Sequence, residues 1–325
     1  MEIDIELSNF VTNVGNVREI NPAELEERKA IAVENLILHL KALTHEADTG
    51  VLSHIDLMSN STRVGETGPP NVEEPVLSHD PSTEMHWKES FTALDNADKA
   101  IKITDIIIRK IEMKKDVFDQ FMRSLRGRVS NLCKIIFNHT NLCGEGLISL
   151  STLVEQCPVL ETLELSHIQI DDINVATCLS RALTSLPRTI YLHLPYCNLG
   201  NNPETLSFIL QLEVKGISLR NNNIDSLGVV KIAECIERNS PIQSLGLGKN
   251  NLNDEDAVVI SRALKRNTTL TSLNLEENNF TSVGVKTLFS SVFDNSSLNA
   301  ISLSNTHAKY MSPTINTISN TLSRQ

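Results

Sequence analysis

Ile242-Gln-Ser-Leu-Gly-Leu-Gly-Lys-Asn-Asn-Leu252 recurs later in the chain as Leu270-Thr-Ser-Leu-Asn-Leu-Glu-Glu-Asn-Asn-Phe280 and, less exactly, as Leu298-Asn-Ala-Ile-Ser-Leu-Ser-Asn-Thr-His-Ala308. The three stretches begin 28 residues apart and share the pattern L-x-x-L-x-L-x-x-N-x-L. A fixed period of this length indicates a chain built from stacked structural repeats. The period, rather than the composition, therefore decides the fold.

Each part of the pattern has a structural role. Leu245 and Leu247 alternate with Gly246, so both leucines point to one face of a short strand. Asn250 and Asn278 fall where the chain bends away from the strand, and their amides can bond backbone groups that have no strand partner. We expect these amides to stack into an asparagine ladder.

A helix is expected after each bend. For the helix that follows Leu252, the cap is Asn253 or Asp254, two alternatives that the sequence leaves open. Its predicted apolar stripe consists of Val258, Val259, Ala263 and Leu264. The next helix begins near residue 282 and is predicted to turn Val285, Leu288, Phe289 and Val292 inward. A single unit cannot bury both of its faces, so neighbouring units must stack.

The same pattern extends toward the N-terminus with less regular lines. The lines begin at residues 103, 132, 160, 189, 214, 242, 270 and 298. Their spacing stays at 28 or 29 residues except for one interval of 25 after Thr189. The bend residue becomes Cys197, Ile168 and Thr140 in the earlier lines. We expect the short helix near residues 203–212 to bend the stack locally.

These motifs resemble the ribonuclease-inhibitor type of leucine-rich repeat, a class also found in NOD-like receptors and in activators of the Ran GTPase. The resemblance rests on the strand pattern, the period and the Asn or Cys at the bend, and it covers about residues 101–325. It implies an α/β solenoid shaped like a horseshoe, with a parallel concave sheet and convex helices. Unrelated binding proteins share this scaffold, so it does not by itself define a function.

The first part of the chain has a different composition. Of the net charge of −11, residues 1–100 contribute −12, because they hold 19 acidic and 7 basic residues. We expect an acidic N-terminal segment, residues 1–50, with a capping helix over about 21–45 that covers the open end of the first repeat. The alternative for this helix is a partner-binding role. Residues 51–325 are predicted to form the repeat domain, with a disordered insertion at about 63–82 that is rich in Gly, Pro, Glu and Ser.

Charge, cysteines and hydropathy limit the partners and the compartment. The acidic balance argues against nucleic acid, and no apolar run approaches the length of a membrane span. The first residues lack the basic start and apolar core expected of a signal peptide. The six cysteines show no paired spacing, which is typical of buried thiols in a reducing compartment. We therefore expect a cytoplasmic protein with no membrane partner, and we leave its oligomeric state open.

No catalytic motif is present: the sequence lacks a Walker loop, G-x-S-x-G, H-E-x-x-H and C-x-x-C. The expected function is therefore not enzymatic and requires no cofactor. His139, His167 and His193 raise the question of a metal, since equivalent positions on adjacent strands lie about 5 Å apart. Glu164 is the one further ligand on those lines, so we expect no metal site.

The concave face is the expected binding surface, because the third, fifth, seventh and eighth residues of each line point outward there. Two of the three tyrosines of the chain lie on one line of this face. Tyr and Arg are common anchors of protein interfaces. The predicted partner-binding site contains Tyr191, His193, Tyr196, Arg220, His139, His167 and Glu164.

The leading hypothesis is a non-catalytic scaffold that binds a protein partner in the concave groove. One alternative is a GTPase-activating protein of the Ran-activator type, which the shared repeat class suggests. Another is a structural subunit of a cytoskeletal or ciliary assembly, docked through the acidic N-terminus and the insertion. The sequence does not identify the partner.

Overall fold

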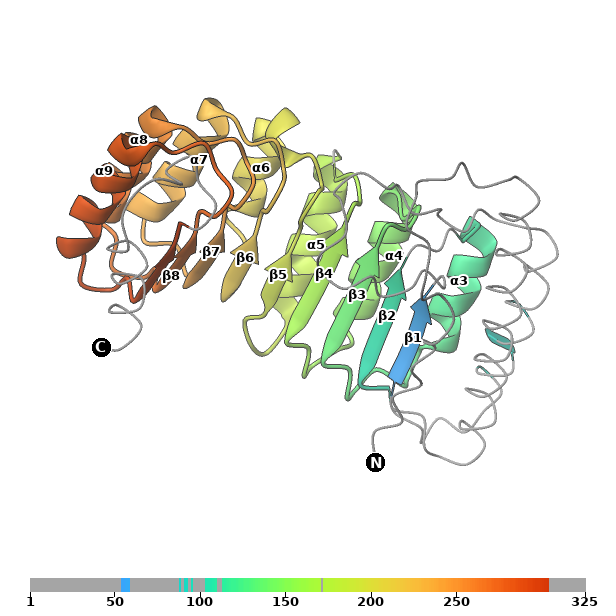
Figure 1. Ribbon diagram of the computed structural model, residues 1–325. Helices are drawn as coiled ribbons and strands as arrows, with labels where there is room; N and C mark the ends of the chain where they lie inside the picture. The colour runs from blue at the N-terminus through green and yellow to red at the C-terminus, as the bar shows by residue number, and fades with distance from the viewer. Residues whose placement is uncertain are drawn as a thin grey trace, which may run out of the picture.

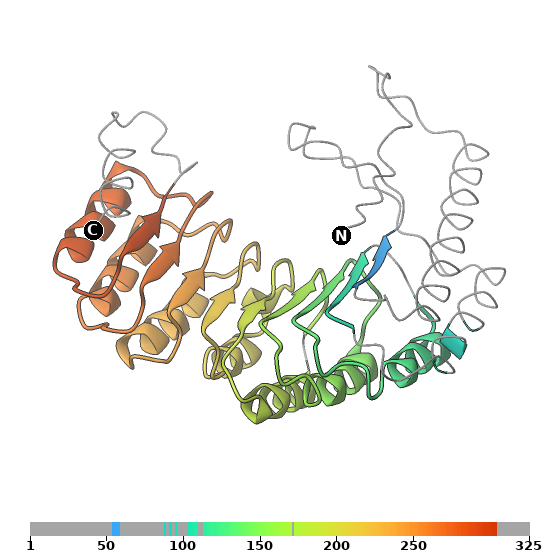
Figure 2. The same cartoon turned by 90° about the horizontal axis from the view of Figure 1, so that it is seen from below.

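The computed structural model describes residues 54–58, 88, 91–92, 95, 103–109, 113–170 and 172–303. The predicted capping helix at about 21–45 and the predicted insertion at about 63–82 lie outside these residues. Within them, parallel strands and helices alternate along a curved solenoid (Figure 1). The strands line the inner side of the arc and the helices its outer side (Figure 2). The leucine-rich repeat architecture predicted from the sequence is thus confirmed.

The nine described strands form one sheet in chain order. They are β1 (His54–Met58), β2 (Asp105–Arg109), β3 (Lys134–Asn138), β4 (Thr162–Ser166), β5 (Tyr191–His193), β6 (Gly216–Ser218), β7 (Ser244–Gly246), β8 (Ser272–Asn274) and β9 (Ala300–Ser302). Every neighbouring pair is parallel, and equivalent repeat positions pair directly, as Leu245 does with Leu273. Parallel neighbours require a crossover after each strand, which the helices provide.

The helices follow the strands on the convex side. They are α3 (Lys115–Ser124), α4 (Gly144–Val154), α5 (Ile173–Ser185), α6 (Pro203–Ile209), α7 (Ser226–Glu237), α8 (Asp254–Leu264) and α9 (Ser282–Phe293), with a short 3₁₀ turn η1 (Leu199–Asn201) before α6. The helix α6 has 7 residues, against 12 in α7. It falls in the interval of 25 residues, as the spacing predicted.

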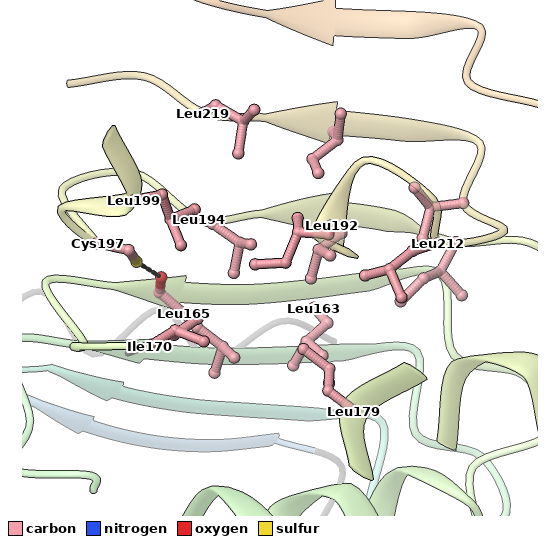
Figure 3. Packing of buried hydrophobic residues seen from close by; sticks show 14 of the residues in the cluster. Leu163, Leu165, Ile170, Leu179, Leu192, Leu194, Cys197, Leu199, Leu212 and Leu219 are labelled. Atoms are coloured by element: carbon pink, nitrogen blue, oxygen red, sulfur yellow. Dashed lines mark hydrogen bonds between the residues drawn. The ribbon is translucent and has the colours of Figure 1, made fainter. Parts of the chain in front are cut away.

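One continuous core fills the space between the sheet and the helices. The fourth and sixth residues of each line are apolar and point into it, as Leu163, Leu165, Leu192 and Leu194 show for two successive repeats (Figure 3). Each of these side chains is fully buried, which stabilises the fold by roughly 1.5–3 kcal/mol per residue relative to exposure. Because each repeat completes the core of its neighbour, the repeats depend on one another for stability.

The predicted asparagine ladder is present. The Asn250 Oδ1 atom accepts hydrogen bonds from the backbone of the preceding repeat, at 2.8 Å from Asn222 N and 3.2 Å from Ile224 N. Its Nδ2 atom donates to Leu219 O at 2.8 Å. Asn278 repeats this arrangement toward Asn250, and Asn222 repeats it toward Cys197. All three asparagines are buried, so their amides satisfy backbone groups that water cannot reach.

The ladder weakens toward the N-terminus. Cys197 Sγ lies 3.0 Å from Leu165 O (Figure 3), so the thiol donates to the preceding repeat as the Nδ2 atom of Asn250 does to Leu219 O. Ile168 offers no polar group, and the buried Thr140 Oγ1 has no hydrogen-bond partner. Neither residue makes the bonds of a ladder asparagine, but Asn141, directly after Thr140, bonds both backbone groups of Met113 in the preceding repeat, each at 2.9 Å.

The helix following Leu252 has one of the two predicted cap residues but differs from the predicted apolar stripe. Both proposed cap residues are used, but on different helices: Asn253 caps α8 in a capping box, whereas Asp254 accepts a bond from Gly284 N in α9. The stripe was partly wrong, since Ala257 and Ile260 are buried while Val258 is exposed. For α9 the prediction holds, with Val285, Leu288 and Val292 buried and Phe289 packed against the core.

Candidate functional site

The predicted site residues other than Arg220 divide into two groups on the concave side. The first group occupies the eighth position of successive lines, immediately after each strand, and we call these residues the corner row. The corner row consists of His139, His167, Tyr196, Asn221, Lys249 and Glu277. The second group, which we call the strand group, lies on β4 and β5 and consists of Glu164, Tyr191 and His193.

The corner row has a distinctive backbone. All six residues have a positive φ, between 50° and 59°. In this left-handed conformation, the backbone N–H groups of the first five corner-row residues donate hydrogen bonds to the next repeat. Each acceptor is the carbonyl of the seventh residue in the next line, as Pro195 O is for His167 N at 3.1 Å. Asn and His tolerate this region better than most residues, whereas Tyr196 adopts it at a cost. The repeated turn places the six side chains in register along one edge of the sheet.

Three of these side chains form a continuous stack. The ring centroids of His139 and His167 are 3.3 Å apart, and those of His167 and Tyr196 are 4.1 Å apart with an interplanar angle of 12°. Asn138 Oδ1 lies 2.5 Å from His139 Nδ1. The structure therefore brings together three of the predicted site residues as one aromatic surface.

The environment of His167 keeps it neutral. Burial, together with the nearby charge of His139, lowers the pKa of His167 to about 4. Both effects disfavour the imidazolium form. The His167 ring in the middle of the stack is therefore neutral at neutral pH.

Polar and charged residues follow the stack in the corner row: Asn221, Lys249 and Glu277. Lys249 Nζ lies 5.8 Å from the centroid of the Tyr196 ring, at the limit of a cation–π contact. Arg220, at the seventh position of its line, forms an ion pair with Glu277 two lines further on. The backbone carbonyl of Arg220 also accepts a bond from Tyr196 N at 3.0 Å. The aromatic stack thus gives way to charged side chains toward the C-terminal repeats.

The strand group lies on the sheet itself. Glu164 of β4 and His193 of β5 pair in register on adjacent strands. Tyr191 lies across Gly216 of β6, since a Cβ atom at Gly216 would be 2.7 Å from Tyr191 Cδ1. Lys215 Nζ is 5.3 Å from the Tyr191 ring centroid.

Sequence reasoning placed Lys249 and Glu277 on the concave face but left them out of the site, and it did not include Lys215. The repeat register was the signal for Lys249 and Glu277, because both share the eighth position with Tyr196.

Several residues bear on the question of metal and thiol chemistry. In the described part of the chain, no group of three or more His, Cys, Asp or Glu side chains is arranged to hold a metal ion. His193 lies at the fifth position of its line, so it does not share the row of His139 and His167.

The six cysteines are free, and burial raises the pKa of Cys157 and Cys197 to about 12, so these two thiols are not reactive nucleophiles. No helix within the described ranges is long and apolar enough to cross a membrane.

The stacked parallel repeats, the common core and the asparagine ladder define a leucine-rich repeat protein. Within this class, residues 203–324 match the family model described as the TMOD/LMOD leucine-rich domain. The match includes α6 to α9 and the C-terminal strands, together with Arg220, Lys249 and Glu277. No curated protein matches the chain.

Two solved structures are similar at low identity. The leucine-rich repeat-containing protein LegL7 from Legionella pneumophila is 15% identical, with a TM-score of 0.46 over 69% of this chain and 71% of that chain. A complex of TLR13 with ssRNA13 is 12% identical, with a TM-score of 0.23 over 66% of this chain and 47% of that chain. At these values neither structure bears on the partner of this chain.

Proposed function

We propose that this chain is a non-catalytic structural protein of the cytoskeleton, which binds an actin-containing partner through the concave side of its repeats. The observation that carries the proposal is the match of residues 203–324 to the TMOD/LMOD leucine-rich domain, a tropomodulin and leiomodin family of actin regulators. The match supports a cytoskeletal role over GTPase activation, and a cytoplasmic location follows from that role. The ribonuclease-inhibitor resemblance concerns the scaffold and does not choose a partner.

We place the contact on the corner row and the strand group. Tyr191 and Tyr196 are 38% and 37% exposed, which leaves enough of each ring free to bury against a partner. The stack beneath Tyr196 and the glycine beneath Tyr191 hold both rings in one position, so little side-chain entropy is lost on binding. Arg220 and Lys249 add donors for acidic groups beside these rings.

The test is co-sedimentation of the full chain with actin filaments, alongside a binding titration with monomeric actin. The site variant is Tyr191→Ala/Tyr196→Asn/Arg220→Ala, in which Asn is chosen at position 196 because it tolerates the left-handed backbone. We expect this variant to bind at least about tenfold more weakly than the native chain, since interface Tyr and Arg residues often contribute more than about 1 kcal/mol each.

The matched control removes three exposed side chains from the convex face, in the variant Leu227→Ala/Val283→Ala/Arg238→Ala. It should bind actin as the native chain does. If both triple variants lose the same affinity for actin, the concave side is not the binding site. If the native chain binds neither filaments nor monomeric actin, the actin assignment is wrong.

A further inference from the structure

The ion pair between Arg220 and Glu277 directs the Arg220 side chain away from the aromatic stack. Arg220 Nη2 donates to Glu277 Oε1, on the second line after its own. Adjacent parallel strands lie about 4.8 Å apart, so the two side chains bridge a gap of roughly 10 Å between their lines. On the line between them, a Cβ atom at Gly248 would be 2.7 Å from Arg220 Nη1. The guanidinium therefore lies over the β7 repeat, on the opposite side of Arg220 from the line of Tyr196.

Glu277 makes this contact from an unfavourable backbone conformation. Its φ is 54°, in the left-handed region, where the equivalent residue two lines earlier is Asn221. Asn tolerates this region because its short side chain bonds locally, an advantage that Glu lacks. The cost at Glu277 therefore indicates a role for its side chain. The exposed pair with Arg220 contributes little to the stability of the fold, so we looked for that role in binding.

The two lines next to Tyr196 carry positive charge only. Residues 214–224 and 242–252 contain Lys215, Arg220 and Lys249 but no Asp or Glu. Lys215 and Lys249 form no ion pair with the residues that the structure describes, and each lies near the ring of an exposed tyrosine. Glu277 is thus the carboxylate, from a later line, that neutralises one of these three cations. This part of the concave side is complementary to an acidic surface.

We propose that Arg220 recognises a carboxylate side chain of the partner, and that Glu277 occupies the guanidinium until the partner binds. The proposal rests on the concave site proposed above and names the chemistry that this site recognises: an acidic side chain beside the group that contacts Tyr196. A guanidinium binds a carboxylate through two parallel hydrogen bonds, so the partner replaces Glu277 in kind. The exchange is feasible because the paired side chains of Arg220 and Glu277 are 33% and 37% exposed.

The first test measures the affinity of full-chain variants for actin. Glu277→Asn removes the competing carboxylate and suits the left-handed backbone, so it should bind about two- to fivefold more tightly than the native chain. Arg220→Ala/Glu277→Asn should bind as Arg220→Ala does, because Glu277 acts only through Arg220. The matched control is Glu276→Gln, which removes one charge at the adjacent position, where the carboxylate bonds the Ser302 hydroxyl. It should stay within about 1.5-fold of the native affinity. Weaker binding by Glu277→Asn, or an equal gain in Glu276→Gln, would overturn the proposal.

The second test does not require actin. The full ¹⁵N-labelled chain is titrated with N-acetyl-glutamate amide, whose side chain carries the carboxylate, and the Nε–H signal of Arg220 is followed. In Glu277→Asn this signal should reach half of its shift at a probe concentration about two- to fivefold lower than in the native chain. The same response in both chains would overturn the competition. If the native chain binds neither form of actin, the proposed function fails, whereas this titration still decides whether Glu277 competes for Arg220.

Discussion

Arg220 and Glu277 form an ion pair across the repeat that separates them, and the intervening repeat has a glycine at the crossing point. A Cβ atom at Gly248 would lie 2.7 Å from Arg220 Nη1 and 3.3 Å from Glu276 O. Gly248 thus leaves space for Arg220 to reach a residue 57 positions later in the chain. The pair links three successive repeats at the edge of the concave face.

Gly248→Ala is therefore expected to loosen this pair. The paired side chains are 33% and 37% exposed, so the pair itself contributes only about 0.5–1 kcal/mol. A double-mutant cycle with Arg220→Ala and Glu277→Ala should give a coupling energy in that range in the native background. In the Gly248→Ala background the coupling should fall close to zero. An unchanged coupling would mean that Arg220 reaches Glu277 by another path.

The asparagine ladder makes a strong prediction about stability. Asn250→Ala removes the acceptor for the amides of Asn222 and Ile224 and leaves buried N–H groups without partners. We expect the free energy of unfolding to fall by roughly 2–4 kcal/mol. Urea denaturation followed by circular dichroism measures this change.

Asn279 supplies the control for the ladder. It follows Asn278 directly but is exposed. Asn279→Ala should lower the free energy of unfolding by less than about 1 kcal/mol, as surface changes usually do. Similar losses for Asn250→Ala and Asn279→Ala would contradict a special role for the ladder.

The lowered pKa of His167 predicts that the free energy of unfolding depends on pH. Its pKa in the folded chain is about 4, lowered by burial and by His139 from an ordinary value of 6.5. A lowered histidine pKa means that the unfolded chain binds the proton first, so stability falls as the pH decreases from about 6.5 toward 4. Since the ring is only partly buried, we expect this loss to be about 1 kcal/mol.

The measurement is urea denaturation of the native chain and of His167→Asn across this pH range. Asn carries no charge and tolerates the positive φ at this position. The acid-induced loss of stability should be smaller in the variant by about the predicted amount. If both proteins lose the same stability, the titration of other groups explains the effect.

Asp254 connects two helices, because it lies in α8 and its carboxylate accepts hydrogen bonds at the N-terminus of α9, where Thr281 is the N-cap. Its Oδ1 atom accepts bonds from Thr281 N at 2.8 Å and Gly284 N at 3.0 Å, and its Oδ2 atom bonds the Thr281 hydroxyl. Burial opposes ionisation of this carboxyl, but the bonds from Thr281 and Gly284 outweigh it and lower its pKa.

Asp254→Ala should therefore lower the free energy of unfolding by about 1 kcal/mol, the usual cost of losing a helix cap. Hydrogen exchange should become faster at the first amides of α9, and the amides of α8 should change little. Faster exchange confined to α8 would place the effect of Asp254 in its own helix instead.

Much of the scaffold could be predicted because the repeat is a local pattern. The alternation of Leu245, Gly246 and Leu247 determines a strand, and its recurrence after 28 residues determines that the strands stack in parallel. The asparagine at each bend was predictable for the same reason, since its partners belong to the adjacent repeat in the same register. The residues of the candidate site could be predicted only as positions on the concave face of the sheet.

The sequence by itself thus determined the solenoid, the ladder and the row on which His139, His167 and Tyr196 lie. The tertiary structure decided that their rings stack, that Arg220 passes over Gly248 to Glu277, and that Val258 is exposed rather than packed in the core. The physical reason is that the period specifies which residues are neighbours, whereas side-chain direction depends on the packing of two or three repeats at once.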